Sequence, residues 1–202
     1  MNGLRRELRR KGWHLFLLLY LVVFLMAGQR AFLPWMLGWT AVVAVVETLR
    51  LRSAAVRDAL AGPFSGIMRE HEASCYSGVL YATLGVLGSA VLFGHEPRVV
   101  TAALLYLAFA DTASALAGLA WGRRLFTILG SRRSLEGTAA GAGAALLCGA
   151  AAGLPWPATL AGAAAFAAVD SVPVPPNDNL WIPLASSFAV GAALGRGPAW
   201  PW

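Results

Sequence analysis

Four short polar clusters interrupt a mostly apolar sequence, and the first lies close to the N-terminus. It comprises Glu7, Arg10, Lys11 and His14, where the last three follow Glu7 by three, four and seven residues. These spacings place the side chains along one face of a helix, which would offer donors, an acceptor and a titratable ring. A basic anchor at the membrane surface, with Glu7 paired to Lys11, explains the same residues without chemistry.

The second cluster is a carboxylate in an apolar stretch, Asp111, followed by Gly118 and Gly122. A charged side chain inside a membrane-spanning segment costs free energy, so it is a candidate functional residue. The two glycines lie on nearly the same helical face and would let another helix or a phosphate chain approach closely. A glycine packing motif with Asp111 paired to an arginine is the alternative, but it explains only the glycines.

The third cluster contains Arg132, Arg133, Ser134, Glu136 and Gly137, at the start of a predicted helix. Ser134 can cap that helix, and free backbone N–H groups beside two guanidinium groups would bind an anion such as phosphate. Glu136 would repel a bare phosphate but could hold Mg²⁺ between itself and the phosphates. A capped, basic helix start is the alternative.

The fourth cluster, Asp178 and Asn179, follows a proline-rich turn and precedes the last predicted helix. Hard oxygen ligands in such a loop suit Mg²⁺ or a ribose, whereas a turn with an Asx cap explains them locally. His71 lies between Glu70 and Glu72 but lacks zinc-type spacing, which indicates a solvated loop. The sequence has no Walker A, GxGxxG, GxSxG or HExxH motif, which argues against the familiar nucleotide-binding folds.

The composition indicates what must position these clusters. The chain is 58% apolar and only 13% charged, with a mean hydropathy of +0.63, which is too apolar for an ordinary soluble domain. Because a spanning helix needs about 17–25 mostly apolar residues, we expect an all-α protein, a polytopic transmembrane bundle of about seven helices. It would form one integral membrane domain over residues 1–202. The expected spans are residues 13–28, 32–47, 78–93, 99–120, 139–153, 158–169 and 181–194.

Basic residues are distributed unevenly between the two sides of this bundle. Of the 16 Lys and Arg residues, 13 lie in segments on one side and three in turns on the other. This positive-inside pattern predicts a cytoplasmic N-terminus with all four clusters at the cytoplasmic face. It also explains the net charge of +6 without nucleic acid. Arg50, Arg52 and Arg57 are expected only to fix the orientation, and Cys75 and Cys148 have no assigned role. We expect no signal-peptide cleavage, because Glu7 and the lack of a clean small-x-small site argue against it.

Taken together, the four clusters resemble the motifs of the CTP-dependent lipid kinases. That family includes dolichol and polyprenol kinases, phytol kinase and the CTP-dependent diacylglycerol kinase. The resemblance runs in order through almost the whole chain. The matching segments are Glu7-x-x-Arg10-Lys11-x-x-His14, Asp111-Thr-x-x-Ala115-x-x-Gly118-x-x-x-Gly122, Ser134-Leu-Glu136-Gly137-Thr138 and Asp178-Asn179-Leu-x-Ile182-Pro183.

This resemblance implies transfer of a phosphoryl group from CTP, with Mg²⁺, to the hydroxyl of a membrane lipid alcohol. Phytol, geranylgeraniol or a polyprenol would fit, and so would diacylglycerol. On this hypothesis Asp111, Glu136 and Asp178 are the metal ligands. Asp111, His14 and Glu136 are the catalytic residues, with either His14 or Asp111 accepting the proton. The residues that would bind the nucleotide and its phosphates are Arg10, Lys11, Gly118, Gly122, Arg132, Arg133, Ser134, Gly137 and Asn179.

The chain departs from the family pattern at several positions. Arg124 and Arg133 stand where Lys is common, Ala110 where Gly is, and Asp170 where Glu is. Because Arg and Lys bind phosphate differently, the preference for CTP or ATP stays open. Other functions also stay open: a phosphatidate cytidylyltransferase-like enzyme, an ion-coupled transporter with Asp111 and Asp170 on its path, and a non-catalytic assembly protein. The sequence is compatible with a homo-oligomer.

Overall fold

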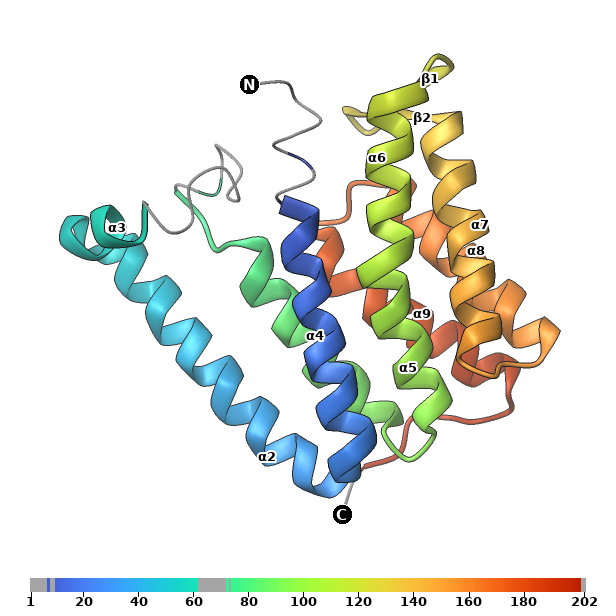
Figure 1. The fold of residues 1–202 in the computed structure, drawn as a ribbon, viewed down its shortest axis with the longest axis horizontal. Helices are drawn as coiled ribbons and strands as arrows, with labels where there is room; N and C mark the ends of the chain where they lie inside the picture. Colours follow the sequence, from blue (N-terminus) through green and yellow to red (C-terminus); the bar gives the residue numbers. More distant parts are fainter. Residues whose placement is uncertain (1–6, 8–9, 62–71, 73, 201–202) are drawn as a thin grey trace.

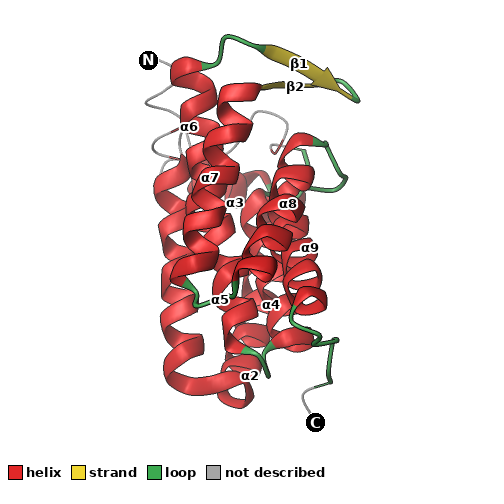
Figure 2. Cartoon of the chain, turned by 90° about the vertical axis from the view of Figure 1, so that its right-hand side faces the viewer, coloured by secondary structure: helices red, strands yellow, loops and turns green. Residues whose placement is uncertain are grey.

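The computed structural model describes residue 7, residues 10–61, residue 72 and residues 74–200. These residues are mostly helical, and the helices run side by side (Figures 1 and 2), so the predicted helical architecture is confirmed. The α-helices in chain order are α2 (Phe16–Arg52), α3 (Ala54–Ala61), α4 (Gly78–Phe93), α5 (Pro97–Leu105), α6 (Asp111–Trp121), α7 (Leu135–Ala151), α8 (Trp156–Ser171) and α9 (Asp178–Ala193).

Within the described part of the chain, two continuous helical segments are long and apolar enough to cross a membrane. They are Arg10–Arg52, with 43 residues, and Pro97–Trp121, with 25. The first includes a 3₁₀ turn, η1 (Trp13–Leu15), before α2, and the second joins α5 to α6. Helices α4 and α7 are apolar but shorter.

The first long segment folds back on itself at Gly28. The φ of Gly28 is 71°, in the left-handed region that glycine adopts without strain. Its two halves therefore run in opposite directions (Figure 1), and the reversal falls between the first two expected spans. The side-chain amide of Gln29 donates to the carbonyls of Ala90 and Val91, at 2.9 and 3.4 Å. These bonds hold the reversal against the end of α4.

The second long segment contains a π-helical turn, η3 (Tyr106–Ala110), between α5 and α6. The backbone N–H of Asp111 donates to the carbonyl of Tyr106, five residues earlier. Such wide turns are frequent at functional sites. Asp111 is the first residue after this turn, so the turn sets the direction in which its carboxylate points.

The all-α expectation is wrong in one place. An antiparallel hairpin of β1 (Leu125–Ile128) and β2 (Ser131–Ser134) lies between α6 and α7. It extends sideways at one end of the bundle (Figure 2). Leu129 and Gly130 connect the strands with φ of 47° and 82°, and a two-residue hairpin turn needs such consecutive positive angles. The sequence concealed this turn, because Leu129 stands where Asn, Asp or Gly is usual.

Small residues allow the helices to pack closely. Tyr106 is fully buried, and its hydroxyl lies against Gly149 of α7 and Gly162 of α8. A methyl group would lie 2.9 Å from this hydroxyl at Gly149 and 2.5 Å from it at Gly162. Both distances are shorter than a normal contact, so the two glycines make the room that Tyr106 occupies.

Candidate functional site

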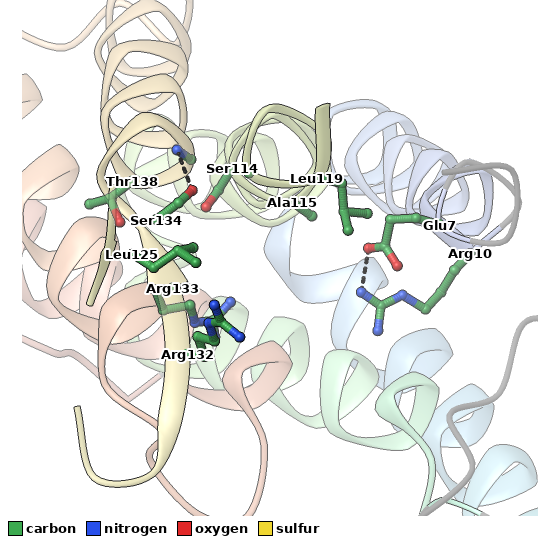
Figure 3. A pocket seen from close by; sticks show the side chains of 12 residues that line it. Glu7, Arg10, Ser114, Ala115, Leu119, Leu125, Arg132, Arg133, Ser134 and Thr138 are labelled. Carbon is green, nitrogen blue, oxygen red and sulfur yellow. Dashed lines mark hydrogen bonds and ion pairs between the residues drawn. The ribbon is translucent and has the colours of Figure 1, made fainter. Parts of the chain in front are cut away.

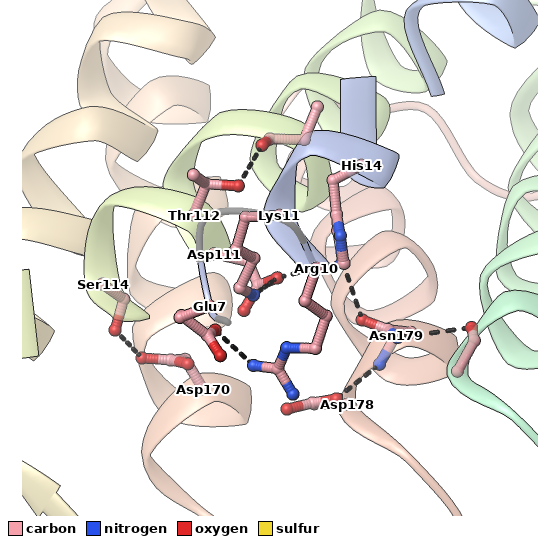
Figure 4. A network of polar contacts seen from close by, with 12 residues as sticks. Glu7, Arg10, Lys11, His14, Asp111, Thr112, Ser114, Asp170, Asp178 and Asn179 are labelled. Carbon is pink, nitrogen blue, oxygen red and sulfur yellow. Dashed lines mark hydrogen bonds and ion pairs between the residues drawn. The ribbon is translucent and has the colours of Figure 1, made fainter. Parts of the chain in front are cut away.

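Side chains from distant parts of the sequence meet near the hairpin end of the bundle (Figure 4). Lys11 Nζ contacts Asp111 Oδ2 directly, and His14 Nε2 lies 3.3 Å from the same oxygen. His14 Nε2 also lies 3.5 Å from Asn179 Oδ1, at the start of α9. Lys11 and Asp111 are each 4% exposed. The first, second and fourth polar clusters of the sequence thus form one largely buried group.

The ion pairs differ from those that the sequence suggested. Glu7 contacts Arg10 instead of Lys11, and Asp111 pairs with Lys11 instead of with an arginine. A buried ammonium group and a buried carboxylate each need the other, because an unpaired charge away from water is costly. In this arrangement Lys11 balances Asp111 and is not free to meet a phosphate.

A second buried carboxylate, Asp170 at the end of α8, lies beside this group. Ser114 Oγ donates to Asp170 Oδ2 at 2.6 Å. The Arg133 guanidinium lies between two carboxylates, with Nη1 3.6 Å from Asp170 Oδ1 and Nη2 3.8 Å from Asp178 Oδ2. Asp170 is not among the site residues predicted from the sequence, where it appears only as a departure from the family pattern and as a residue of a possible ion path. A carboxylate that ends an apolar segment was the signal that could have identified it.

A cavity of about 380 Å³ opens beside these carboxylates, between the N-terminal helix, α6 and β2 (Figure 3). Leu119 and Leu125 add apolar surface to its wall, and Ser114 contributes a hydroxyl. The predicted site residues that line it are Arg10, Gly118, Arg132, Arg133, Ser134 and Gly137. Three guanidinium groups around one cavity suit a ligand that carries several negative charges.

The third cluster begins α7 as predicted. Ser134 Oγ accepts the backbone N–H of Gly137 at 3.1 Å, which confirms the predicted cap. A methyl group would lie 3.2 Å from Ser134 Oγ at Gly118 and 2.9 Å from it at Gly122. Both glycines therefore let α6 pack closely on the start of α7, and packing accounts for them. Gly118 also borders the cavity, whereas Gly122 does not.

Glu136 fixes the base of the hairpin. Its carboxylate accepts the backbone N–H groups of Arg123 and Arg124 at 3.1 and 3.2 Å. The pKa of Glu136, which precedes the expected span at 139–153, is lowered first by its own backbone N–H and then by these two amides. Its contacts in the described structure are thus with backbone.

Asp178 and Asn179 begin α9, and an Asx cap is present beside them. Asn177 Oδ1 accepts the N–H of Asn179 at 2.9 Å. Asp178 Oδ1 also accepts this N–H, at 3.0 Å, while Asp178 Oδ2 faces Arg133 and Asn179 Oδ1 faces His14. Asn179 Nδ2 also donates to the carbonyl of Gly78 at 3.3 Å, which links the site to α4.

The three predicted metal ligands do not come together in this structure. Asp111 is engaged by Lys11 and His14, Glu136 by amides of the hairpin, and Asp178 lies beside Arg133. Among the described residues, no group of three His, Cys, Asp or Glu side chains could hold a metal ion. His71 and Glu70 lie outside the described residues.

Arg50 has a structural role beyond the expected one of fixing the orientation. It is 3% exposed, and its Nη2 donates to Glu47 Oε2 at 2.9 Å and to the carbonyl of Cys75 at 2.7 Å. Glu47 Oε2 in turn accepts the N–H of Ser77 at 2.8 Å, just before α4. Glu47 and Arg50 thus form a clamp that fixes the start of α4, next to Asn179. The spacing Glu-x-x-Arg on a helix was the available signal.

Comparisons with protein-family models, with curated proteins and with solved structures find no match to this chain.

Proposed function

We propose that this protein transfers a phosphoryl group from CTP to the hydroxyl of a membrane lipid alcohol. The observation that carries the proposal is a cavity of about 380 Å³ with three arginines around it, beside a buried Lys11–Asp111–His14 group. This volume lies in the ordinary range of small-molecule sites, about 300–1,000 Å³. Phosphoryl transfer demands mainly positioning and charge neutralisation, and these residues are suited to both.

The membrane arrangement is part of the proposal. We infer a bundle of about seven spans with a cytoplasmic N-terminus and the site at the cytoplasmic face. Helices α4, α8 and α9 have 16 residues each, which corresponds to about 24 Å. This is somewhat short of the hydrocarbon thickness of about 30 Å, so we expect the bilayer to thin around the protein. The positive-inside pattern supports the orientation.

Each group has a distinct part in the proposed reaction. Arg10, Arg132 and Arg133 would neutralise the phosphates in the cavity. Asp111 would orient His14, whose Nε2 lies near both Asp111 and Asn179, and His14 or Asp111 would accept the proton of the lipid hydroxyl. Mg²⁺, when bound, would add charge neutralisation at the phosphates.

Activity of the purified protein tests this proposal. The detergent-solubilised protein is incubated with Mg²⁺, CTP or ATP, and a panel of isoprenoid alcohols and diacylglycerol, and phosphorylated lipid and nucleoside diphosphate are measured. We expect Arg132→Gln to raise KM for the nucleotide, while Arg57→Gln, on α3 away from the cavity, has no effect. If the folded protein phosphorylates no alcohol from either nucleotide, the kinase proposal fails.

The same assay separates the alternatives. A phosphatidate cytidylyltransferase-like enzyme would release pyrophosphate from CTP and phosphatidate, whereas a kinase releases CDP. An ion-coupled transporter needs carboxylates on a path that reaches both faces. Asp111 and Asp170 instead lie in one network with residues of the hairpin end, which favours chemistry at one face.

A further inference from the structure

The position of Arg133 between two carboxylates is unusual in its geometry. Its guanidinium nitrogens lie 3.6 Å from Asp170 Oδ1 and 3.8 Å from Asp178 Oδ2, too far for hydrogen bonds. Asp170 Oδ1 and Arg133 Nε are both buried, and among the described residues neither has a hydrogen-bond partner. Buried polar atoms are nearly always hydrogen-bonded. Arg133 is thus attracted to both carboxylates by charge but forms a hydrogen bond with neither of them.

Asp170 is nevertheless held firmly in place. Its side chain is 2% exposed, and Oδ2 accepts the hydroxyl of Ser114 at 2.6 Å. This bond leaves Oδ1 as the free oxygen on the side of Arg133. Carboxylates that bind metal ions are themselves hydrogen-bonded by neighbouring groups, which fix their orientation.

We propose that Asp170 and Asp178 form a binding site for a divalent cation, and that Arg133 is the counter-ion that occupies this place in the absence of the cation. Two carboxylates carry two negative charges, and one guanidinium balances only one of them. Mg²⁺ ordinarily binds one or two carboxylates together with water and phosphate oxygens. Asp111 is excluded from this pair because Lys11 and His14 already engage it.

A cation that displaces the Arg133 side chain from the two carboxylates would leave it room in the cavity. Its side chain is 29% exposed and lines the cavity together with Arg10 and Arg132. Arrival of a cation would therefore release a third guanidinium group toward anions in the cavity. This inference deepens the proposed function, because it assigns its metal site, but the cation can bind whether or not the protein is a kinase.

Binding of Mn²⁺ to the purified protein without nucleotide, measured by electron paramagnetic resonance, tests the site. Removal of a competing charge about 4 Å away should tighten Mn²⁺ binding by about tenfold or more in Arg133→Gln. A second change, Asp170→Asn in the Arg133→Gln protein, should abolish the gain. Arg132→Gln is the matched control, since Arg132 lines the same cavity but has no ion pair with either carboxylate in the described structure. We expect it to bind Mn²⁺ like the unchanged protein.

The site is refuted if Arg133→Gln binds Mn²⁺ no more tightly, or if Asp170→Asn does not weaken that binding. Tryptophan fluorescence and gel filtration show whether each variant is folded. If Arg133→Gln does not fold, Arg133→Lys is used in its place. Because Lys retains the positive charge, this variant should bind Mn²⁺ within about twofold of the unchanged protein. Asp170→Asn alone must then abolish the stabilisation against heat that Mn²⁺ gives the unchanged protein. Mn²⁺ binding without phosphorylation of any alcohol would sink the kinase proposal and leave the cation site standing.

Discussion

At the scale of single residues, the buried pair of Lys11 and Asp111 decides how the site responds to mutation. From sequence alone, Asp111→Asn is expected to stop turnover without loss of stability. The pair changes that expectation, because Asp111→Asn leaves the Lys11 ammonium buried without its partner. We predict that Asp111→Asn or Lys11→Met costs about 3–5 kcal/mol in free energy of unfolding. The measurement is unfolding in mixed detergent micelles.

The double variant supplies the control for this pair. Lys11→Met with Asp111→Asn removes both charges, so it should cost clearly less than the sum of the two single changes. Additive costs would show that the two groups do not interact in the folded protein.

Glu136 predicts a pH dependence of stability. Its pKa in the folded protein lies below the ordinary value of 4.5, because backbone N–H groups stabilise the carboxylate. The stabilisation is therefore present above about pH 4.5 and is lost as the pH falls through the lower pKa of the folded state. Thermal unfolding at pH 7 should show the unchanged protein more stable than Glu136→Gln, and the difference should shrink as the pH is lowered below 4.5. A difference that does not shrink on acidification would contradict this origin.

The residue types of the site were largely predictable from sequence, but their partners were not. Asp111 stood out because a charged group is expensive in an apolar segment. His14 stood out by its spacing from Glu7 on one helical face, and Asn179 by the proline-rich turn before it. The predicted contact of Glu7 with Lys11 was wrong, because Arg10 takes Glu7 and Asp111 takes Lys11. Each charged side chain had several oppositely charged residues within reach, and the packing of the helices determines which of them it contacts.

At the scale of elements, close contact between α4 and α9 controls the position of Asn179. A methyl group at Gly85 would lie 2.6 Å from Pro183 and 2.9 Å from the carbonyl of Leu180. Gly85→Ala should therefore push α9 away and cost about 1–3 kcal/mol. Gly143 in α7 has open space around its Cα. As the matched control, Gly143→Ala should stabilise the protein by up to about 1 kcal/mol. Equal effects of the two changes on the melting temperature would disprove the contact.

The clamp of Glu47 and Arg50 makes a second prediction about elements. Arg50→Gln leaves Glu47 buried without its cation and frees the segment before α4, so we expect a loss of about 3–5 kcal/mol in unfolding free energy. Arg52 lies on the same helix but is exposed. Arg52→Gln should change stability by no more than about 0.5 kcal/mol. The clamp is absent if the two variants unfold at the same denaturant concentration.

The helices were predictable as apolar runs, whereas their irregularities were not. The reversal at Gly28 falls between the expected spans 13–28 and 32–47, so it agrees with the apolar pattern. The π turn at Tyr106–Ala110 could not be predicted from the sequence, because Asp111 follows an unbroken apolar run. The hairpin turn at Leu129 was also missed, since tertiary structure there overrides the usual preference for a small or polar residue.

At the scale of the whole molecule, the proposed orientation can be read from labelling of cysteines. Cys75 is exposed and lies before α4, at the end of the bundle that holds the site, whereas Cys148 is buried. A membrane-impermeant maleimide should label Cys75 in inside-out vesicles and not in right-side-out vesicles. His95 is exposed at the opposite end of α4, so His95→Cys in a Cys75→Ser protein should show the reverse pattern. Labelling of both positions from one side would overturn the orientation.

The long sequence separations within the site determine when its contacts can form during synthesis of the chain. Lys11 and Asp111 are 100 residues apart, and His14 and Asn179 are 165 apart. At a synthesis rate of about 5–20 residues per second, Lys11 exists for about 5–20 seconds before its carboxylate is made. During that interval the ammonium group lacks the carboxylate that balances it in the folded protein. In the proposed membrane arrangement, we expect the N-terminal end of the first long segment to stay at the membrane surface while the middle of the chain is inserted, so that the buried pair closes late in assembly.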